Sequence, residues 1–299
     1  MKTSTSKAKE KVMQIVFTVC ACVSILAVAL ICIFLFANGL PAIFEIGPLK
    51  FLLGTTWQPS NSIYGILPMI LGSIYVTAGA LVVGVPIGLL TAVYMSRFAG
   101  PLTNKVLLPA VQLLAGIPSV VYGFFGMMVM APGIEAFLKS DFAKNVLHWQ
   151  GKGLSMFTAS LLLGFMILPT IITVSKTSID AVPQSYYEGS LALGATHERS
   201  VFCAVLPAAK SGVLSAVILG VGRAVGETMA VVMVAGNQPR MPQGIFQGLR
   251  TMTSNIVIEM GYAADLHREA LIATGVVLFV FILIINLCFS AVKGRDQHA

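Results

Sequence analysis

Six stretches of the chain are about 20 residues or more in length and nearly free of charged residues, and this pattern limits the fold more than any other feature. A helix that spans a bilayer needs about 20 mainly apolar residues. The spans predicted from these stretches are 12–37, 64–95, 106–131, 154–174, 211–235 and 270–292. We therefore expect an all-α polytopic membrane protein with six transmembrane helices, in which residues 1–299 form one transmembrane domain.

The composition excludes an ordinary soluble domain. Hydrophobic residues make up 57% of the 299 residues and charged residues only 10%, whereas soluble domains carry about 25% charged residues. The net charge of +7 comes from Lys and Arg scattered along the chain, without the clustered basic stripe that is typical of nucleic-acid binding. The five cysteines lack the spacing of a disulfide framework or a zinc site, so we expect neither a metal nor a cofactor.

Basic residues outside the apolar stretches predict the orientation in the membrane. The first stretch follows Lys2, Lys7, Lys9 and Lys11, and it is too long for the apolar core of a signal peptide, so we expect it to remain as a helix. With the N-terminus inside, the inner loops hold eleven Lys and Arg and the outer loops hold seven. Because cytoplasmic loops carry more Lys and Arg, we predict that both termini lie in the cytoplasm.

This orientation places loops 38–63, 132–153 and 236–269 outside and loop 175–210 in the cytoplasm. Trp57 and Trp149 lie in outer loops, where tryptophan commonly anchors a protein at the membrane interface. The sequence places the four histidines in loops or in the C-terminal tail, without a ligand cluster: His148, His197, His267 and His298. A membrane enzyme that acts on lipid phosphates therefore has little support.

The fifth stretch contains two charged residues, Arg223 and Glu227, four positions apart. An arginine at the centre of a spanning helix costs about 2.5–3.5 kcal/mol on insertion scales, and residues at i and i+4 share one helix face. Two rows of small residues surround the pair: Ala216, Gly220 and Ala224, and Gly222, Gly226 and Ala230. Because such rows let helices approach closely, we expect the charged face to point into protein or a pore.

Two interpretations of the pair are open. One is an internal ion pair that holds helices together, although arginine before glutamate is the weaker order at i, i+4. The other is that intramembrane charges mark the path of a charged solute. The donor fork of arginine matches tetrahedral oxyanions, and phosphate near neutral pH keeps a proton for a carboxylate, whereas sulfate does not. We therefore predict that Arg223 and Glu227 line a phosphate pathway.

Loop 175–210 contains a segment with the pattern of a short, capped helix. Residues 188–193 can form the helix, Gly194 can end it in the left-handed conformation, and Pro207 precedes the fifth span. The segment is either a solvated connector or a helix that inserts into a groove on a soluble partner. The chain has no Walker A motif, so it is not expected to be an enzyme, and an ATPase that drives transport must be a separate chain.

The spacing of this segment resembles the cytoplasmic motif of bacterial ABC importer permeases: Glu-Ala-Ala, three residues, Gly, nine residues, Ile-x-Leu-Pro. Four residues match in register: Glu188, Gly194, Leu206 and Pro207. Gly189 and Ser190 replace the usual alanines, and Ala204 replaces the usual isoleucine. Four segments are similar to the phosphate-transport permease family: 113–123, 222–230, 57–59 and 64–65. The Gly-Glu-Thr-Met-Ala ending at 226–230 favours the PstC-type branch of that family.

The resemblance, which covers about residues 51–292, implies a MetI-like ABC importer permease fold in the bacterial inner membrane. It implies three partners besides membrane lipid: a PstA-type second permease, a dimer of PstB-type ATPases and a PstS-type extracytoplasmic phosphate-binding protein. It further implies that the residues that couple to the ATPase are Glu188, Gly189, Ser190, Gly194, Leu206 and Pro207. The alternatives are a permease for another oxyanion or a phosphonate, and a secondary phosphate carrier in which Glu227 relays protons.

Overall fold

The computed structural model describes residues 4–141, 149 and 151–296 of the chain. Lys2, Lys144, His148 and His298 lie outside these residues, so the predictions that involve them are not tested.

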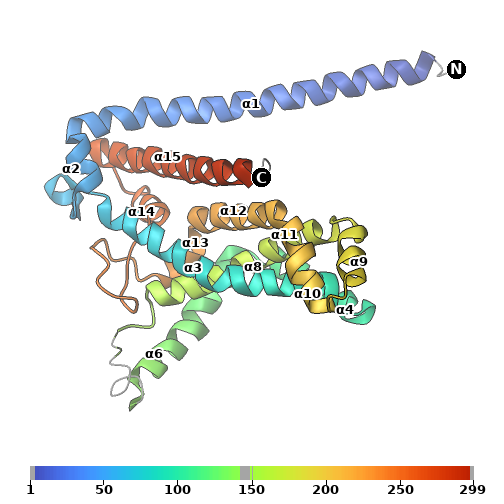
Figure 1. The fold of residues 1–299 in the computed structure, drawn as a ribbon. Helices are drawn as coiled ribbons and strands as arrows, with labels where there is room; N and C mark the ends of the chain where they lie inside the picture. The colour runs from blue at the N-terminus through green and yellow to red at the C-terminus, as the bar shows by residue number, and fades with distance from the viewer. Residues whose placement is uncertain (1–3, 142–148, 150, 297–299) are drawn as a thin grey trace.

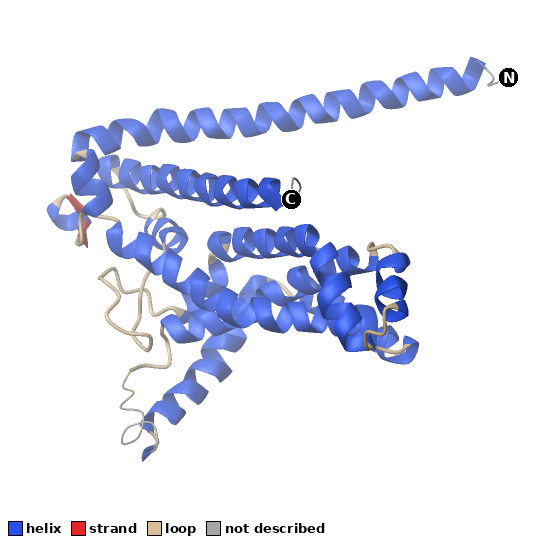
Figure 2. Ribbon diagram, viewed as in Figure 1, coloured by secondary structure: helices blue, strands red, loops and turns tan. Residues whose placement is uncertain are grey.

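The described residues are mostly helical (Figure 2). The long helices are α1 (Ser4–Ile46), α3 (Leu67–Val93), α4 (Pro101–Gly116), α8 (Met156–Asp180), α12 (Lys210–Gly226) and α15 (Asp265–Asp296). The shorter helices are α2 (Pro48–Leu53), α5 (Ser119–Phe125), α6 (Ala131–Lys139), α9 (Gln184–Ala192), α10 (His197–Ser200), α11 (Leu206–Ala208), α13 (Met229–Val234) and α14 (Met252–Glu259).

Three segments are π-helical and one is a 3-10 turn. The π-helical segments are η2 (Tyr94–Phe98), η3 (Gly126–Met130) and η4 (Val201–Val205), and the 3-10 turn is η1 (Pro59–Asn61). Strands β1 (Trp57–Gln58) and β2 (Ile63–Tyr64) form an antiparallel hairpin, in which Trp57 pairs with Tyr64.

The long helices lie side by side (Figure 1), with α1 against α15 and with α12 against α8 and α3. One end of the molecule, which we call the hairpin end, carries β1, β2 and α14. The opposite end, which we call the α9 end, carries η2, α9 and α10. The N-terminal end of α1 and the C-terminal end of α15 both point towards the α9 end (Figure 1).

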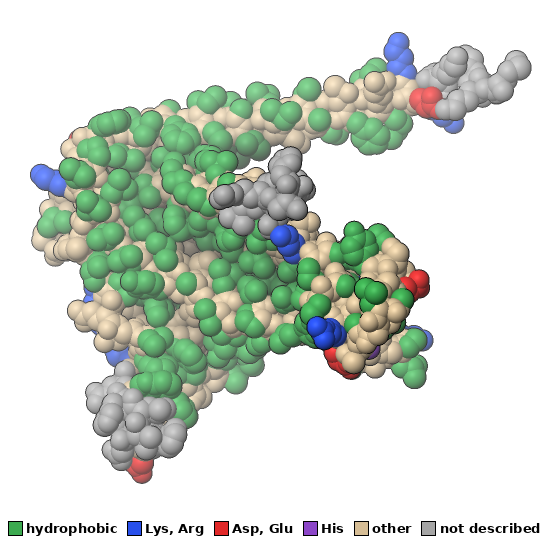
Figure 3. Space-filling view, viewed as in Figure 1, with side chains coloured by type: hydrophobic (Ala, Val, Ile, Leu, Met, Phe, Trp, Pro, Cys, Tyr) green, Lys and Arg blue, Asp and Glu red, His purple; other side chains and the backbone are tan. Residues whose placement is uncertain are grey.

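Five helical segments among the described residues are long and apolar enough to cross a membrane: 9–46, 67–98, 119–139, 156–180 and 265–291. A sixth is added if 197–208 and 210–226, which meet at a bend of 70°, form one span. The visible face of these helices is largely apolar, and Lys, Arg, Asp and Glu gather at their ends (Figure 3). The chain is therefore an all-α polytopic membrane protein.

Two spans differ from the sequence prediction. The sequence places the third span at 106–131, but α4 ends at Gly116 and the apolar helix runs over 119–139. Pro118 causes the break, because a residue before proline avoids the α conformation, and Ile117 is extended with ψ 126°. The fifth span, predicted as a continuous helix over 211–235, is interrupted after Gly226.

The most extensive helix contact among the described residues joins α3 to α8, and glycines lie in it. A Cβ on Gly84 would lie 2.7 Å from the side chain of Ile167, and a Cβ on Gly88 would lie 2.8 Å from that of Ile171. Small residues of this kind let two helix backbones approach closely. The helix α3 continues through Pro86, and the main buried cluster of the molecule forms around α8 from Val76, Leu163, Ile167, Ile171, Ala224 and Val234.

Candidate substrate pathway and coupling segment

The chain leaves the helical path between α12 and α13, beside the two predicted pathway residues. Glu227 is extended, with ψ 129°, and α13 begins at Met229. Side chains satisfy the backbone groups that the break releases. The Thr228 hydroxyl donates to the Gly226 carbonyl at 3.2 Å, and the Thr253 hydroxyl donates to the Glu227 carbonyl at 3.2 Å.

The break separates Arg223 from Glu227, so the predicted i, i+4 pair on one helix face does not form. Arg223 lies in the last turn of α12, and Glu227 precedes the first turn of α13. A cation is favoured at a helix C-terminus and an anion at an N-terminus. The interruption therefore converts an unfavourable order within one helix into a favourable charge at the end of each of two helices.

Arg223 is half-buried and has spare donors. Its Nη1 donates to Thr170 Oγ1 of α8 at 3.3 Å, which is its only hydrogen bond among the described residues. A guanidinium has five N–H donors. The neighbouring residues Gly222 and Gly226 are exposed, and a Cβ on either would meet open space. The guanidinium thus lies beside an uncovered surface of small residues.

The Glu227 carboxylate faces the start of α13. Its Oε1 accepts hydrogen bonds from the backbone N–H groups of Thr228 and Ala230, both at 3.2 Å. The side chain is half-buried. A small cavity with a mixed lining lies beside it, between α3, the break and α14. Its polar lining comes from Ser73, Thr77, Glu227, Thr251 and Thr253, and its apolar lining from Val76, Ala224, Val225 and Val231.

The two rows of small residues have different surroundings. Ala216, Gly220 and Ala224 are buried, and Gly220 lies against Ile171 of α8, so this row is a packing surface. Gly222 and Gly226 remain exposed, while Ala230 is buried on α13. The second row is therefore not continuous, because the helix ends at Gly226.

The predicted coupling segment forms the helix α9, which is longer than the sequence suggests. Gly194 ends it with φ 86°. The Gly194 N–H donates to the Leu191 carbonyl at 2.9 Å, and the Ala195 N–H donates to the Ser190 carbonyl at 3.2 Å. This is a Schellman cap, which glycine at this position favours.

No residue of α9 is buried. Glu188 and Gly189 are exposed, and Leu193 directly after the helix is 91% exposed. Leu206 and Pro207 lie on α11, where Leu206 packs against a cluster that includes Val182 and Val205. The predicted coupling residues thus fall into two places, an exposed helix and a partly buried turn before α12.

A buried polar cluster at the hairpin end was not predicted from the sequence. Glu259 is 5% exposed. Its Oε1 accepts a hydrogen bond from Arg250 Nη1 at 2.5 Å, and its Oε2 accepts one from Trp57 Nε1 at 2.9 Å. Oε2 also lies 2.8 Å from His267 Nε2. Trp57 is therefore a core residue at 5% exposure rather than an interfacial anchor.

The environment of Glu259 lowers the pKa of its carboxyl group. Burial by itself raises the pKa, but the hydrogen bonds from Trp57, His267 and Arg250, together with the charge of Arg250, outweigh it. The cluster joins residues as far apart as 57 and 259, so no local pattern could have revealed it.

Two of the four histidines, predicted to lie in loops, are on helices: His197 begins α10, and His267 lies in the first turn of α15.

Comparison with known proteins places the chain among transport permeases. It is 38% identical over 290 residues to the probable ABC transporter permease protein YqgH of Bacillus subtilis, which covers 94% of this chain and 91% of the relative. It is 33% identical over 240 residues to the phosphate transport system permease protein PstC of Haemophilus influenzae, which covers 77% of this chain and 76% of the relative.

Two solved structures share the fold. One is a chain of the inward-facing MetNI methionine ABC transporter, with a TM-score of 0.56 and 18% identity over 78% of this chain and 94% of that chain. The other belongs to a bacterial ABC transporter involved in the import of the acidic polysaccharide alginate, with a TM-score of 0.59 and 12% identity over 95% of this chain and 99% of that chain.

The family model of the binding-protein-dependent transport system inner membrane components matches residues 84–295. That range begins within α3 and includes α9, the break at Glu227 and all but the last residue of α15. The chain therefore belongs to the binding-protein-dependent transport system inner membrane components and is a permease subunit of an ABC transporter.

Proposed function

We propose that this chain is a permease subunit of an ATP-driven phosphate importer and forms half of the translocation pathway. The observation that carries the proposal is the half-buried guanidinium of Arg223, which has one long hydrogen bond and lies beside the exposed surface of Gly222 and Gly226. Charged residues at membrane depth commonly mark a substrate path. Similarity to several phosphate transport system permease proteins named PstC supports phosphate as the solute.

Glu227 supplies the selectivity in this proposal. Glu227 lies four residues after Arg223, and its carboxylate already accepts hydrogen bonds from two backbone N–H groups. Phosphate near neutral pH retains an O–H that can donate to a carboxylate, whereas sulfate retains none. The pair therefore favours a protonated oxyanion over a fully ionised one.

A PstA-type permease covers the exposed Gly222 and Gly226 surface and completes the pathway. A PstS-type binding protein delivers phosphate at the hairpin end, and two PstB-type ATPases dock at the α9 end, which lies in the cytoplasm with both termini. The exposed α9 and Leu193 present the surface for the ATPase. ATP binding moves α9 and reorients the helices around Arg223, so that phosphate passes from one side to the other.

Phosphate uptake by the complete complex in proteoliposomes tests the proposal. We expect Arg223→Ala to lower uptake about tenfold to a hundredfold, the range that corresponds to losing one hydrogen bond to a charged group. Lys139→Ala, at an exposed lysine of α6, is the matched control and should leave uptake unchanged. Uptake that persists at the wild-type level in Arg223→Ala refutes the assignment of this residue.

Another anion is the second candidate, because the relative YqgH is described only as a probable permease. Competition by sulfate, molybdate or a phosphonate separates these solutes. Uptake that needs the membrane potential but no ATP would instead indicate a secondary carrier.

A further inference from the structure

The helix α3 ends in the π-helical segment η2, which contacts the end of α8, the start of α9 and α10. The Ala99 N–H donates to the Tyr94 carbonyl at 2.8 Å, five residues back, and closes the π turn. Isolated π turns recur at functional sites, because the extra residue turns the following side chains to a new direction. In this chain, the three side chains after Met95 all reach the elements that hold α9.

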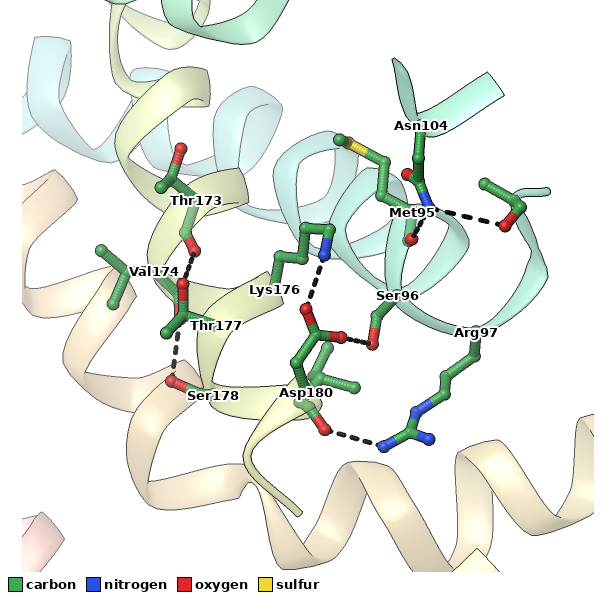
Figure 4. Close-up of polar contacts among 12 residues, drawn as sticks. Met95, Ser96, Arg97, Asn104, Thr173, Val174, Lys176, Thr177, Ser178 and Asp180 are labelled. Atoms are coloured by element: carbon green, nitrogen blue, oxygen red, sulfur yellow. Dashed lines mark hydrogen bonds and ion pairs between the residues drawn. The ribbon is translucent and has the colours of Figure 1, made fainter. Parts of the chain in front are cut away.

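Ser96 and Arg97 fasten η2 to the joint between α8 and α9 (Figure 4). The Ser96 hydroxyl donates to Asp180 Oδ1 at 2.5 Å, at the last residue of α8. The Arg97 guanidinium donates through Nη2 to the Ile179 carbonyl at 2.9 Å and through Nη1 to Gln184 Oε1 at 3.4 Å. One arginine thus contacts the end of α8 and the first residue of α9.

Phe98 contacts α10, which in turn contacts α9. Its ring meets that of His197 edge to face, with 4.7 Å between centroids, and His197 Nδ1 lies 2.8 Å from the Tyr187 hydroxyl. Tyr187 is the α9 residue that packs against the buried cluster formed by Ala92, Val93, Ile179, Val182, Val201, Val205 and Ala209. The segment η2 therefore reaches α9 directly through Arg97 and Gln184, and indirectly through Phe98, His197 and Tyr187.

The opposite end of α3 reaches the break at Glu227. Ser73 Oγ accepts from the Met252 N–H of α14 at 3.0 Å, and Ser73 and Thr77 line the small cavity beside Glu227. The helical run from Leu67 to Phe98 has 32 residues, which gives a rod of about 48 Å. One helical run thus contacts the joint between α8 and α9 at one end and the candidate pathway at the other.

We propose that α3 with η2 carries movement of α9 to the pathway, and that Arg97 and Asp180 are the positioning residues that fasten the two together. The proposal rests on the function proposed above. The joint is not fully satisfied as it stands, because Arg97 Nε is buried without a hydrogen-bond partner. A buried donor without a partner is costly, so any arrangement of the joint that pairs this donor gains that energy.

The experiment compares ATP hydrolysis with phosphate uptake in the reconstituted complex that carries Arg97→Ala or Ser96→Ala, which removes the hydroxyl that donates to the Asp180 carboxylate. We expect the complex to assemble, ATP hydrolysis to stay within about twofold, and uptake to fall about tenfold, the change that corresponds to losing one hydrogen bond to a charged group. Arg97→Lys keeps the charge but cannot reach both acceptors with one nitrogen, so we expect partial recovery. Lys105→Ala, at an exposed lysine of α4, is the control and should match wild type.

Ser96→Ala removes only a hydroxyl group and leaves the ion pair between Lys176 and Asp180 of α8 in place, so it separates a folding defect from a loss of coupling. The inference is overturned if uptake and hydrolysis fall in proportion in an assembled complex, or if uptake per ATP is unchanged. These outcomes differ from failure of the proposed function, in which the wild-type complex itself takes up no phosphate. If it then transports another solute, uptake of that solute per ATP tests the joint in the same way.

Discussion

Two ion pairs in this chain have similar lengths and very different surroundings. Arg250 Nη1 and Glu259 Oε1 are 2.5 Å apart, with side chains 11% and 7% exposed. Lys139 Nζ and Glu135 Oε1 are 2.7 Å apart, with side chains 70% and 44% exposed. Removing one partner of a buried pair leaves an uncompensated charge, whereas water replaces the partner of an exposed pair. The two glutamates therefore form a matched test of burial.

We expect Glu259→Ala to destabilise the chain by about 3–5 kcal/mol, the usual result of breaking a buried ion pair. The magnitude is plausible for this site because the carboxylate also accepts from Trp57 and contacts His267. Glu259→Gln should cost less, because the amide oxygen still accepts one of these donors. Glu135→Ala should leave the stability unchanged.

Thermal unfolding of the purified chain in detergent, followed by circular dichroism, compares the three variants with the wild type. The pKa of Glu259 is lowered below 4.5 in the folded chain. A lowered carboxyl pKa gives stability that is present above the unfolded pKa and lost as pH falls through the folded pKa. The difference in stability between wild type and Glu259→Gln should therefore be largest above about pH 4.5 and become smaller as the pH falls below it. Equal melting temperatures for Glu259→Ala and Glu135→Ala at pH 7 would refute the argument from burial.

Three further predictions follow from single sites. Gly194→Val forces φ 86° on a branched residue and should cost about 1–2 kcal/mol locally, measured as faster proteolysis after α9. Leu193→Asp should leave the melting temperature unchanged, since the side chain is 91% exposed, yet should reduce co-purification of the ATPase; undiminished co-purification contradicts docking at this residue. Gly39→Ala places a Cβ 2.5 Å from Val276 Cγ2 and should cost about 1–3 kcal/mol through overpacking, whereas Gly133→Ala, which meets open space, should not.

The positions of the long helices α3 and α8 could be predicted because they depend on local composition. The apolar stretches at 64–95 and 154–174 appear as α3 and α8, although each helix extends or shifts by a few residues. Gly194 ends α9 because a left-handed residue favours glycine wherever it occurs. The third span was misplaced because the apolar character continues across Pro118, while the backbone preference of Ile117 does not.

The break after Gly226 was missed because its sequence is compatible with a continuous helix. Residues 211–222 and 229–234, on the two sides of the break, are apolar or small. The interruption is stabilised instead by groups distant in sequence, such as Thr253, which donates to the Glu227 carbonyl from α14. Local propensity cannot report a hydrogen bond of this kind.

The sequence by itself determined that the chain enters a membrane as apolar helices and that charges within the fifth stretch are unusual. Burial of apolar surface and the need to satisfy the backbone in lipid are properties of each segment taken alone. Only the tertiary structure decided that Arg223 and Glu227 occupy the ends of two helices, that Glu259 is held by Trp57 and Arg250, and that η2 meets α9. These features depend on contacts between segments far apart in the chain, and the energies of such contacts exist only once the helices have packed.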